Sequence, residues 1–152
     1  MRKAFYLIIT ILFPAVLFSQ TTEKVSTTDQ TLKSLCDGYK FFQKCEIPVD
    51  FKYGKKAVED SMTNYLKANN SQFQNGKKAT FLFVVAKDAN LYNIEMKSGN
   101  ISSDSSIIKA MQQTGGLWEV GKQNSYPICS YVRLEVEFID DRVTVSMVRS
   151  KY

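Results

Sequence analysis

The chain has 152 residues, an apolar content of 44% and a formal net charge of +5, which fits one globular domain with a modest core. It contains no histidine, which excludes nucleophilic triads built on a histidine base and zinc sites that use histidine ligands. Lysine and arginine are scattered among acidic residues, so no basic surface for nucleic acid is predicted.

The first 19 residues have the layout of a secretory signal peptide. Arg2 and Lys3 precede an almost wholly apolar run, residues 4–18, and Ser19 follows it. This run of 15 residues is shorter than the ~20 residues that a membrane-spanning helix needs. We therefore expect cleavage of residues 1–19 and a periplasmic or secreted protein, the alternative being an inner-membrane anchor formed by residues 4–18.

Residues 20–50 are expected to be a lead-in segment, flexible where Thr, Ser and Lys dominate before position 34. The chain has three cysteines, Cys36, Cys45 and Cys129, so three disulfide pairings are possible and each leaves one thiol over. The pairing Cys36–Cys45 is favoured because the loop between these two residues is short. Cys129 is then expected to be a small buried apolar residue.

Residues 51–149 are expected to form the folded domain. Apolar residues at helical spacing, among them Val58, Met62 and Leu66, predict a helix over residues 55–69. Residues 78–86 are apolar on both faces, which predicts a central strand, and residues 91–97 predict the returning strand of a hairpin.

A second helix is predicted from a cap at residues 102–104 to about Thr114. Trp118 is expected to plug the edge of the core, the alternative being an exposed recognition role. A strand follows from Cys129 to Phe138 with strict alternation, and residues 143–148 predict one more strand. This order predicts an α+β fold, with two helices packed on one face of a small three- to four-stranded antiparallel sheet.

The order and punctuation of these segments resemble the C-terminal domain of TonB, the periplasmic protein that energises outer-membrane transporters. The segment F-K-Y-G before the first helix, with Tyr-Leu and Asn at its end, is similar to the opening of that domain. The hairpin of residues 76–91 and the Ser98-Gly99 pair before the second helix also match. The final segment runs from Trp118 through Pro127 into the alternating strand, as in that family.

Departures from the family limit what the resemblance implies. TonB carries a histidine-bearing anchor and a long proline-rich spacer, whereas this chain has no histidine and only three prolines. A role in energy transduction is therefore not implied. The chain is not expected to be an enzyme or to need a cofactor or a metal, since its carboxylates fall at helix caps and turns.

The resemblance implies a protein–protein interaction module that binds extended segments of envelope or outer-membrane transport proteins by β-strand addition. TonB-dependent transporters are the implied partners. The candidate partner-binding residues are Gln123, Asn124, Tyr131, Val132, Arg133, Leu134 and Glu135.

Two other functions remain open, a self-associating structural envelope protein that forms a homodimer, and an enzyme or small-ligand protein using residues 39–51 as a pocket wall. If residues 143–148 pair with residues 133–138, the edge that would receive a partner is covered. The outer edge of residues 143–148 would then be the one available to a partner or a second copy.

Overall fold

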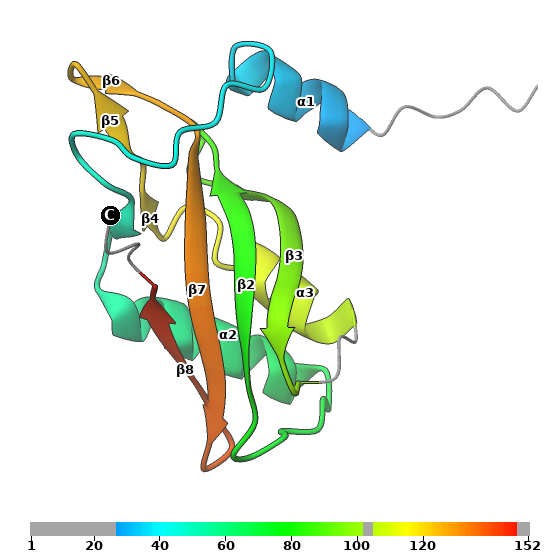
Figure 1. Ribbon diagram of the computed structural model, residues 1–152. Coiled ribbons are helices and arrows are strands. Elements are labelled where there is room, and N and C mark those ends of the chain that lie inside the picture. Colours follow the sequence, from blue (N-terminus) through cyan, green and yellow to red (C-terminus); the bar gives the residue numbers. More distant parts are fainter. Residues whose placement is uncertain (1–26, 102–104, 149–152) are drawn as a thin grey trace, which may run out of the picture.

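The computed structural model describes residues 27–101 and 105–148, so the predicted signal peptide lies outside the described residues. The fold is α+β, as predicted, and a four-stranded antiparallel sheet with the strand order β3-β2-β7-β8 forms its centre (Figure 1). Its strands are β2 (Lys78–Val85), β3 (Leu91–Gly99), β7 (Ser130–Ile139) and β8 (Arg142–Met147). The helices are α1 (Thr27–Leu35), α2 (Lys55–Ala68) and α3 (Ser105–Gln112). Two small pairs join β1 (Asp50–Phe51) with β4 (Trp118–Glu119) and β5 (Lys122–Gln123) with β6 (Tyr126–Pro127).

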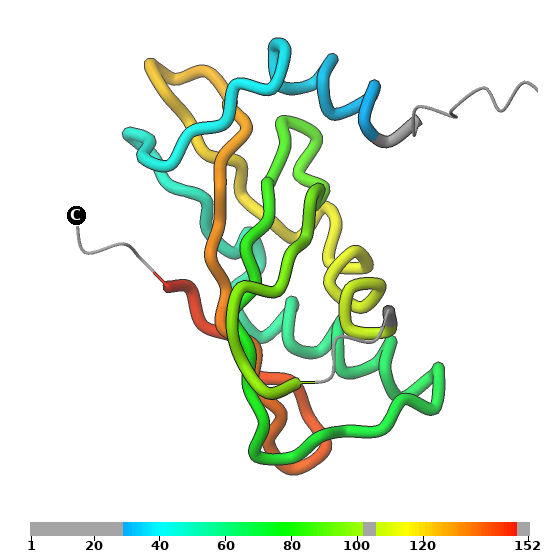
Figure 2. The backbone as a smooth tube through the Cα atoms, turned by 45° about the vertical axis from the view of Figure 1, so that its right-hand side comes forward, coloured from blue at the N-terminus to red at the C-terminus, as the bar shows by residue number. Residues whose placement is uncertain are grey.

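Helices α2 and α3 lie on one face of the sheet, and the main core fills the space between the two layers (Figures 1 and 2). The alternating side chains of β7 that were predicted to point inward, Val132, Leu134, Val136 and Phe138, are all buried there. Trp118 is 1% exposed and packs against the rings of Phe51 and Phe83, which confirms the prediction that it plugs the core. Burial of these apolar faces against each other is the main source of the domain's stability.

The boundaries of α2 follow from its flanking residues. Gly54, with φ of 80°, precedes the helix, and Asn70, with φ of 51°, follows its end. A left-handed residue is a common helix stop, and asparagine tolerates that conformation better than most residues do. The helix thus ends where the sequence predicted, within one residue.

Residues 27–35 form helix α1, where the composition had favoured a flexible lead-in. Leu32, Leu35 and Cys36 lie at i, i+3 and i+4, and this short apolar stripe packs against Val84, Ala86 and Cys129. Val84 points to the face of β2 opposite Phe83 and Val85, so α1 covers one end of the other face of the sheet (Figure 1). Residues 27–35 are therefore helical although their composition is polar, because so few apolar residues suffice when a second cluster is available to receive them.

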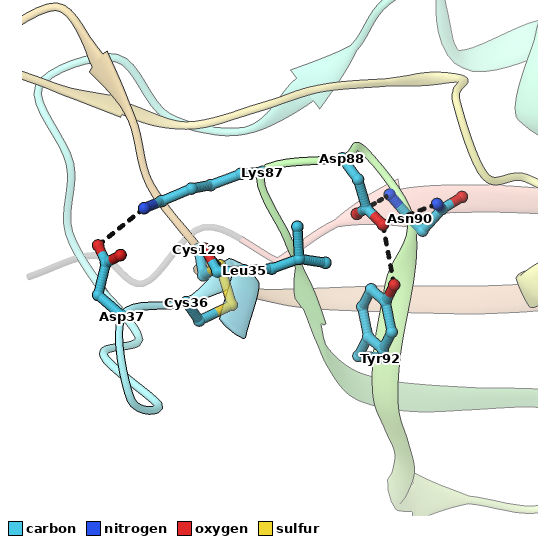
Figure 3. The surroundings of a disulfide bond; sticks show 8 residues. All are labelled: Leu35, Cys36, Asp37, Lys87, Asp88, Asn90, Tyr92 and Cys129. Carbon is cyan, nitrogen blue, oxygen red and sulfur yellow. Dashed lines mark hydrogen bonds and ion pairs between the residues drawn. A yellow bond between two sulfur atoms is a disulfide. The ribbon is translucent and has the colours of Figure 1, made fainter. Parts of the chain in front are cut away.

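Cys36 forms a disulfide with Cys129, and the Cys36–Cys45 pairing favoured from the sequence is wrong (Figure 3). Cys129 joins the cluster under α1. Cys45 has a free thiol, which lies 3.5 Å from the hydroxyl of Ser130, the residue that follows Cys129. Successive residues of an extended chain point to opposite sides. Cys36 and Cys45 therefore lie on opposite sides of the start of β7, and the short loop between them cannot bring their sulfurs together.

Polar contacts hold the region around the disulfide (Figure 3). An ion pair of 2.7 Å joins Lys87 to Asp37 and lowers the pKa of that carboxyl below its ordinary value. In the β2–β3 turn the hydroxyl of Tyr92 donates to Asp88 at 2.8 Å. Burial, together with that carboxylate, raises the pKa of Tyr92 to about 12. The turn and the end of α1 are thereby fixed to the same end of the sheet.

Candidate interaction site at the edge of strand β7

Strand β7 is paired with β2 from Ser130 to Glu137 and along most of its other edge with β8. The pairing with β8 runs from Leu134 opposite Met147 to Ile139 opposite Arg142. A further hydrogen bond of 2.9 Å runs from the Val148 amide to the Arg133 carbonyl. The chain's last strand therefore covers the part of the predicted binding edge that includes Leu134 and Glu135.

The start of the same edge is covered by a different segment. Phe42 lies beside Ser130 in a parallel bridge, with its amide donating to the Cys129 carbonyl and its carbonyl accepting from the Tyr131 amide, both at 2.9 Å. Beyond that point the two segments separate. Between Phe42 and Val148, no described segment pairs with this edge of β7. We call this interval the gap.

We call the residues in this gap, Tyr131, Val132 and Arg133, the open stretch. Within the described residues, neither the Tyr131 carbonyl nor the Arg133 amide has a hydrogen-bond partner. Both groups point away from β2, because Tyr131 and Arg133 make their recorded main-chain bonds with Phe42 and Val148 on the opposite side. In residues 27–101 and 105–148, one acceptor and one donor of β7 are thus left for pairing with an added strand.

Two cavities meet at the open stretch. The first, of about 380 Å³, lies on the face away from α2 and α3 and is lined by Gln43, Leu82, Tyr131, Arg133 and Val148. The second, of about 370 Å³, shares four of these residues and adds Lys44, Cys45, Pro48, Val49, Ser130 and Val132. Val132 points to the helical face of the sheet, so the cavities open to the two sides of one strand edge.

The outer edges of the sheet differ from the open stretch, because one is capped by side chains of α2 and the other belongs to an irregular strand. On the outer edge of β8 the amides of Val143 and Val145 donate to Thr63 Oγ1 and Glu59 Oε1 of α2, each at 3.0 Å. Helix α2 thus supplies acceptors to the edge that had been considered for a second copy.

Strand β3, whose outer edge has no neighbouring strand in the described part of the chain, is irregular. Its pairing with β2 contains two register shifts, and one of them includes Asn93, with φ of 50°. Such bulges bend a strand and disturb regular pairing with a partner. Among the described residues, the open stretch is therefore the place where a regular strand of the central sheet leaves a main-chain donor and acceptor unpaired beside two cavities.

The structure brings together three of the seven predicted site residues, Tyr131, Val132 and Arg133. Gln123 and Asn124 lie apart from them in the β5–β6 hairpin and hold the carboxylate of Glu46, the Asn124 amide at 2.7 Å and the Gln123 side chain at 3.0 Å. This contact fixes the segment before Ile47 against the hairpin. Neither of these residues lines a cavity of the open stretch.

Several residues of the site were not among the predicted binding residues, although residues 39–51 had been considered as a pocket wall and residues 143–148 as a neighbouring strand. Gln43, Lys44 and Pro48 come from the lead-in segment, Leu82 from the central strand and Val148 from the end of β8. A parallel bridge between segments almost ninety positions apart brings the first group to β7. No local periodicity marks such a contact, and only pairs of residues that vary together could have indicated it.

Comparison with protein-family models, with curated proteins and with solved structures finds no match to this chain. The resemblance to the TonB C-terminal domain therefore stays a prediction made from the residues alone.

Two further observations bear on where the protein acts. In residues 27–101 and 105–148, no helix is long and apolar enough to cross a membrane. The Cys36–Cys129 disulfide is consistent with an oxidising compartment such as the periplasm or the extracellular space.

In the described residues, no group of three or more His, Cys, Asp or Glu side chains gathers to hold a metal ion.

Proposed function

We propose that this chain is a periplasmic or secreted protein-interaction module that binds a short extended segment of an envelope protein at the open stretch. The observation that carries the proposal is the gap in the β7 edge, where the Tyr131 carbonyl and the Arg133 amide lack partners in the described residues. An added segment would place its own amide and carbonyl against these two groups. This is β-strand addition over a short length.

The two cavities support the same mode of binding. Successive side chains of an extended segment point to opposite faces, with a period of two residues. A segment that lies along the open stretch would direct one side chain toward Leu82 in the first cavity and the next toward Val132 in the second. Main-chain pairing would provide affinity, and the cavities would select side chains.

The resemblance to the TonB C-terminal domain adds a candidate class of partner, the outer-membrane transport proteins. The proposed site is shorter than the edge inferred from that resemblance, because β8 pairs with the part from Leu134 onward. Self-association through the outer edge of β8 is less favoured, since Thr63 and Glu59 already accept hydrogen bonds from that edge.

The test is a peptide-binding experiment with a variant that fills the gap. Gln43 is exposed and lines both cavities, so Gln43→Trp should obstruct them without disturbing the core. Gln113→Trp, at an exposed position just after α3 on the helical side, is the matched control. Peptides from transporter segments and from random libraries would be titrated against each variant by fluorescence anisotropy.

The proposal predicts that Gln43→Trp weakens binding at least about tenfold and that Gln113→Trp leaves it unchanged. Methylating the one peptide nitrogen that pairs with the Tyr131 carbonyl should weaken binding as well, whereas methylating its neighbours should not. Equal binding by both tryptophan variants would show that the open stretch is not the site.

A further inference from the structure

The open stretch carries positive charge that the described part of the chain leaves uncompensated. Arg133 lines both cavities and Lys44 lines the second, and no acidic side chain lines either one. Neither cation forms an ion pair with a described residue. The nearest carboxylate along β7, Glu135, is held by Lys78 at 3.5 Å.

The surroundings of Arg133 make this charge available to a ligand. Its cross-strand neighbour on β2 is Leu82, and Val148 lies beside it on the other side. Both neighbours are apolar, so they offer the guanidinium no hydrogen-bond acceptor from their side chains. A guanidinium presents donors in a fork that matches a carboxylate, and such charge-assisted pairs are stronger than neutral hydrogen bonds.

The length of the gap restricts the ligand further. Phe42 pairs with β7 at one end and Val148 at the other, so a strand that ran straight through would meet both of them. A chain that ends inside the gap meets only one boundary. Its last residue would also bring a carboxylate to the Arg133 amide, the donor that has no partner among the described residues.

From the charge and the boundaries together we infer that the segment bound at the open stretch is the carboxyl-terminal end of a partner protein. Its terminal carboxylate accepts hydrogen bonds from the Arg133 amide and guanidinium, with Lys44 adding positive charge. This inference rests on the proposed function and specifies the partner of the same site. The chain's own last residues, Arg149 to Tyr152, carry two cations of their own, so charge disfavours them as the occupant.

The experiment uses two libraries of short random peptides, one displayed with free carboxyl ends and the other displayed within a longer chain. Each is selected against the mature protein, and the enriched peptides are synthesised with either a free or an amidated carboxyl end. Arg133→Gln and Lys44→Gln remove the charges at exposed positions. Lys67→Gln, exposed at the end of α2, is the matched control.

We expect enrichment only from the library with free carboxyl ends. Amidation and Arg133→Gln should each weaken binding at least about tenfold, and Lys44→Gln should weaken it less, because a single lysine contributes a point charge without the paired donors. Lys67→Gln should have no effect. Binding should also weaken as salt rises, since exposed charges are screened.

Other outcomes separate this inference from the proposed function. Peptides that bind from the internal library, resist amidation and are blocked by Gln43→Trp would overturn the inference and leave the proposed function intact. Binding that appears only in a variant ending at Val148 would overturn it too, because the chain's own tail would then be the occupant. A complete lack of binders from both libraries would overturn the two proposals together.

Discussion

The hydroxyl of Thr63 should be worth more to this protein than its position on a helix suggests. Thr63 is 5% exposed on α2, and its Oγ1 accepts a hydrogen bond of 3.0 Å from the amide of Val143, which is itself 2% exposed. Thr63→Val keeps the shape of the side chain and removes the acceptor. The Val143 amide is then left buried without a partner.

The size of the effect follows from that unpaired amide. Leaving a buried backbone donor without an acceptor costs about 1–3 kcal/mol. The added methyl group returns up to ~0.8 kcal/mol through apolar burial. We therefore expect Thr63→Val to lower the free energy of unfolding by about 1–2 kcal/mol, as the balance of these two effects.

Urea unfolding followed by circular dichroism measures this change as a lower midpoint with an unchanged slope. Thr80→Val is the matched control, because Thr80 is half-buried in β2 and its hydroxyl bonds to no described residue. Its stability should change by less than ~0.5 kcal/mol. A Thr63→Val protein as stable as the parent would refute the view that α2 caps the edge of β8.

Three further predictions concern the disulfide, the core and Tyr92 beside the β2–β3 turn. Replacing Cys36 and Cys129 together by alanine opens a loop of 93 residues and should lower stability by about 2–5 kcal/mol, whereas peptide mapping that found no bond between them would contradict the structure. Trp118→Phe should cost about 2 kcal/mol in urea unfolding because the indole is buried, and an unchanged midpoint would refute that packing. The pKa of Tyr92 is raised to about 12 in the folded protein, so its contribution to stability should be complete below pH ~10, the ordinary tyrosine pKa, and lost as pH rises from there through the folded pKa of about 12. Asp88→Ala should move the titration of Tyr92, followed by ultraviolet absorbance, part of the way back toward the ordinary tyrosine value, and an unmoved titration would exclude the carboxylate as a cause.

The sequence predicted the elements whose side chains repeat with a clear period. Helix α2 and strands β2, β3, β7 and β8 each have enough residues for the period to be recognised, and the α+β class follows from their order. Helix α1 was not predicted, because only Leu32, Leu35 and Cys36 form its apolar stripe. A stripe of three residues cannot be distinguished from chance in a polar segment.

The disulfide and the open stretch depend on contacts between distant parts of the chain. The short loop between them favoured Cys45 as the partner of Cys36. The pairing depends instead on the side of β7 on which each cysteine lies, and Cys36 and Cys129 lie on the same side. The sequence indicated Tyr131, Val132 and Arg133 as edge residues. It could not indicate that the described pairing would reach only Phe42 on one side of them and Val148 on the other.

Amide hydrogen exchange at Arg133, measured by NMR with and without a selected peptide, tests the account most directly. Without peptide, the Arg133 amide should exchange much faster than the amides of Glu135 and Glu137, which face the paired β8. A bound peptide should slow exchange at Arg133 at least about tenfold and leave Glu137 unchanged. An Arg133 amide that is already as protected as Glu135 in the free protein, or one that a bound peptide does not protect, would contradict the assignment of the open stretch as the binding site.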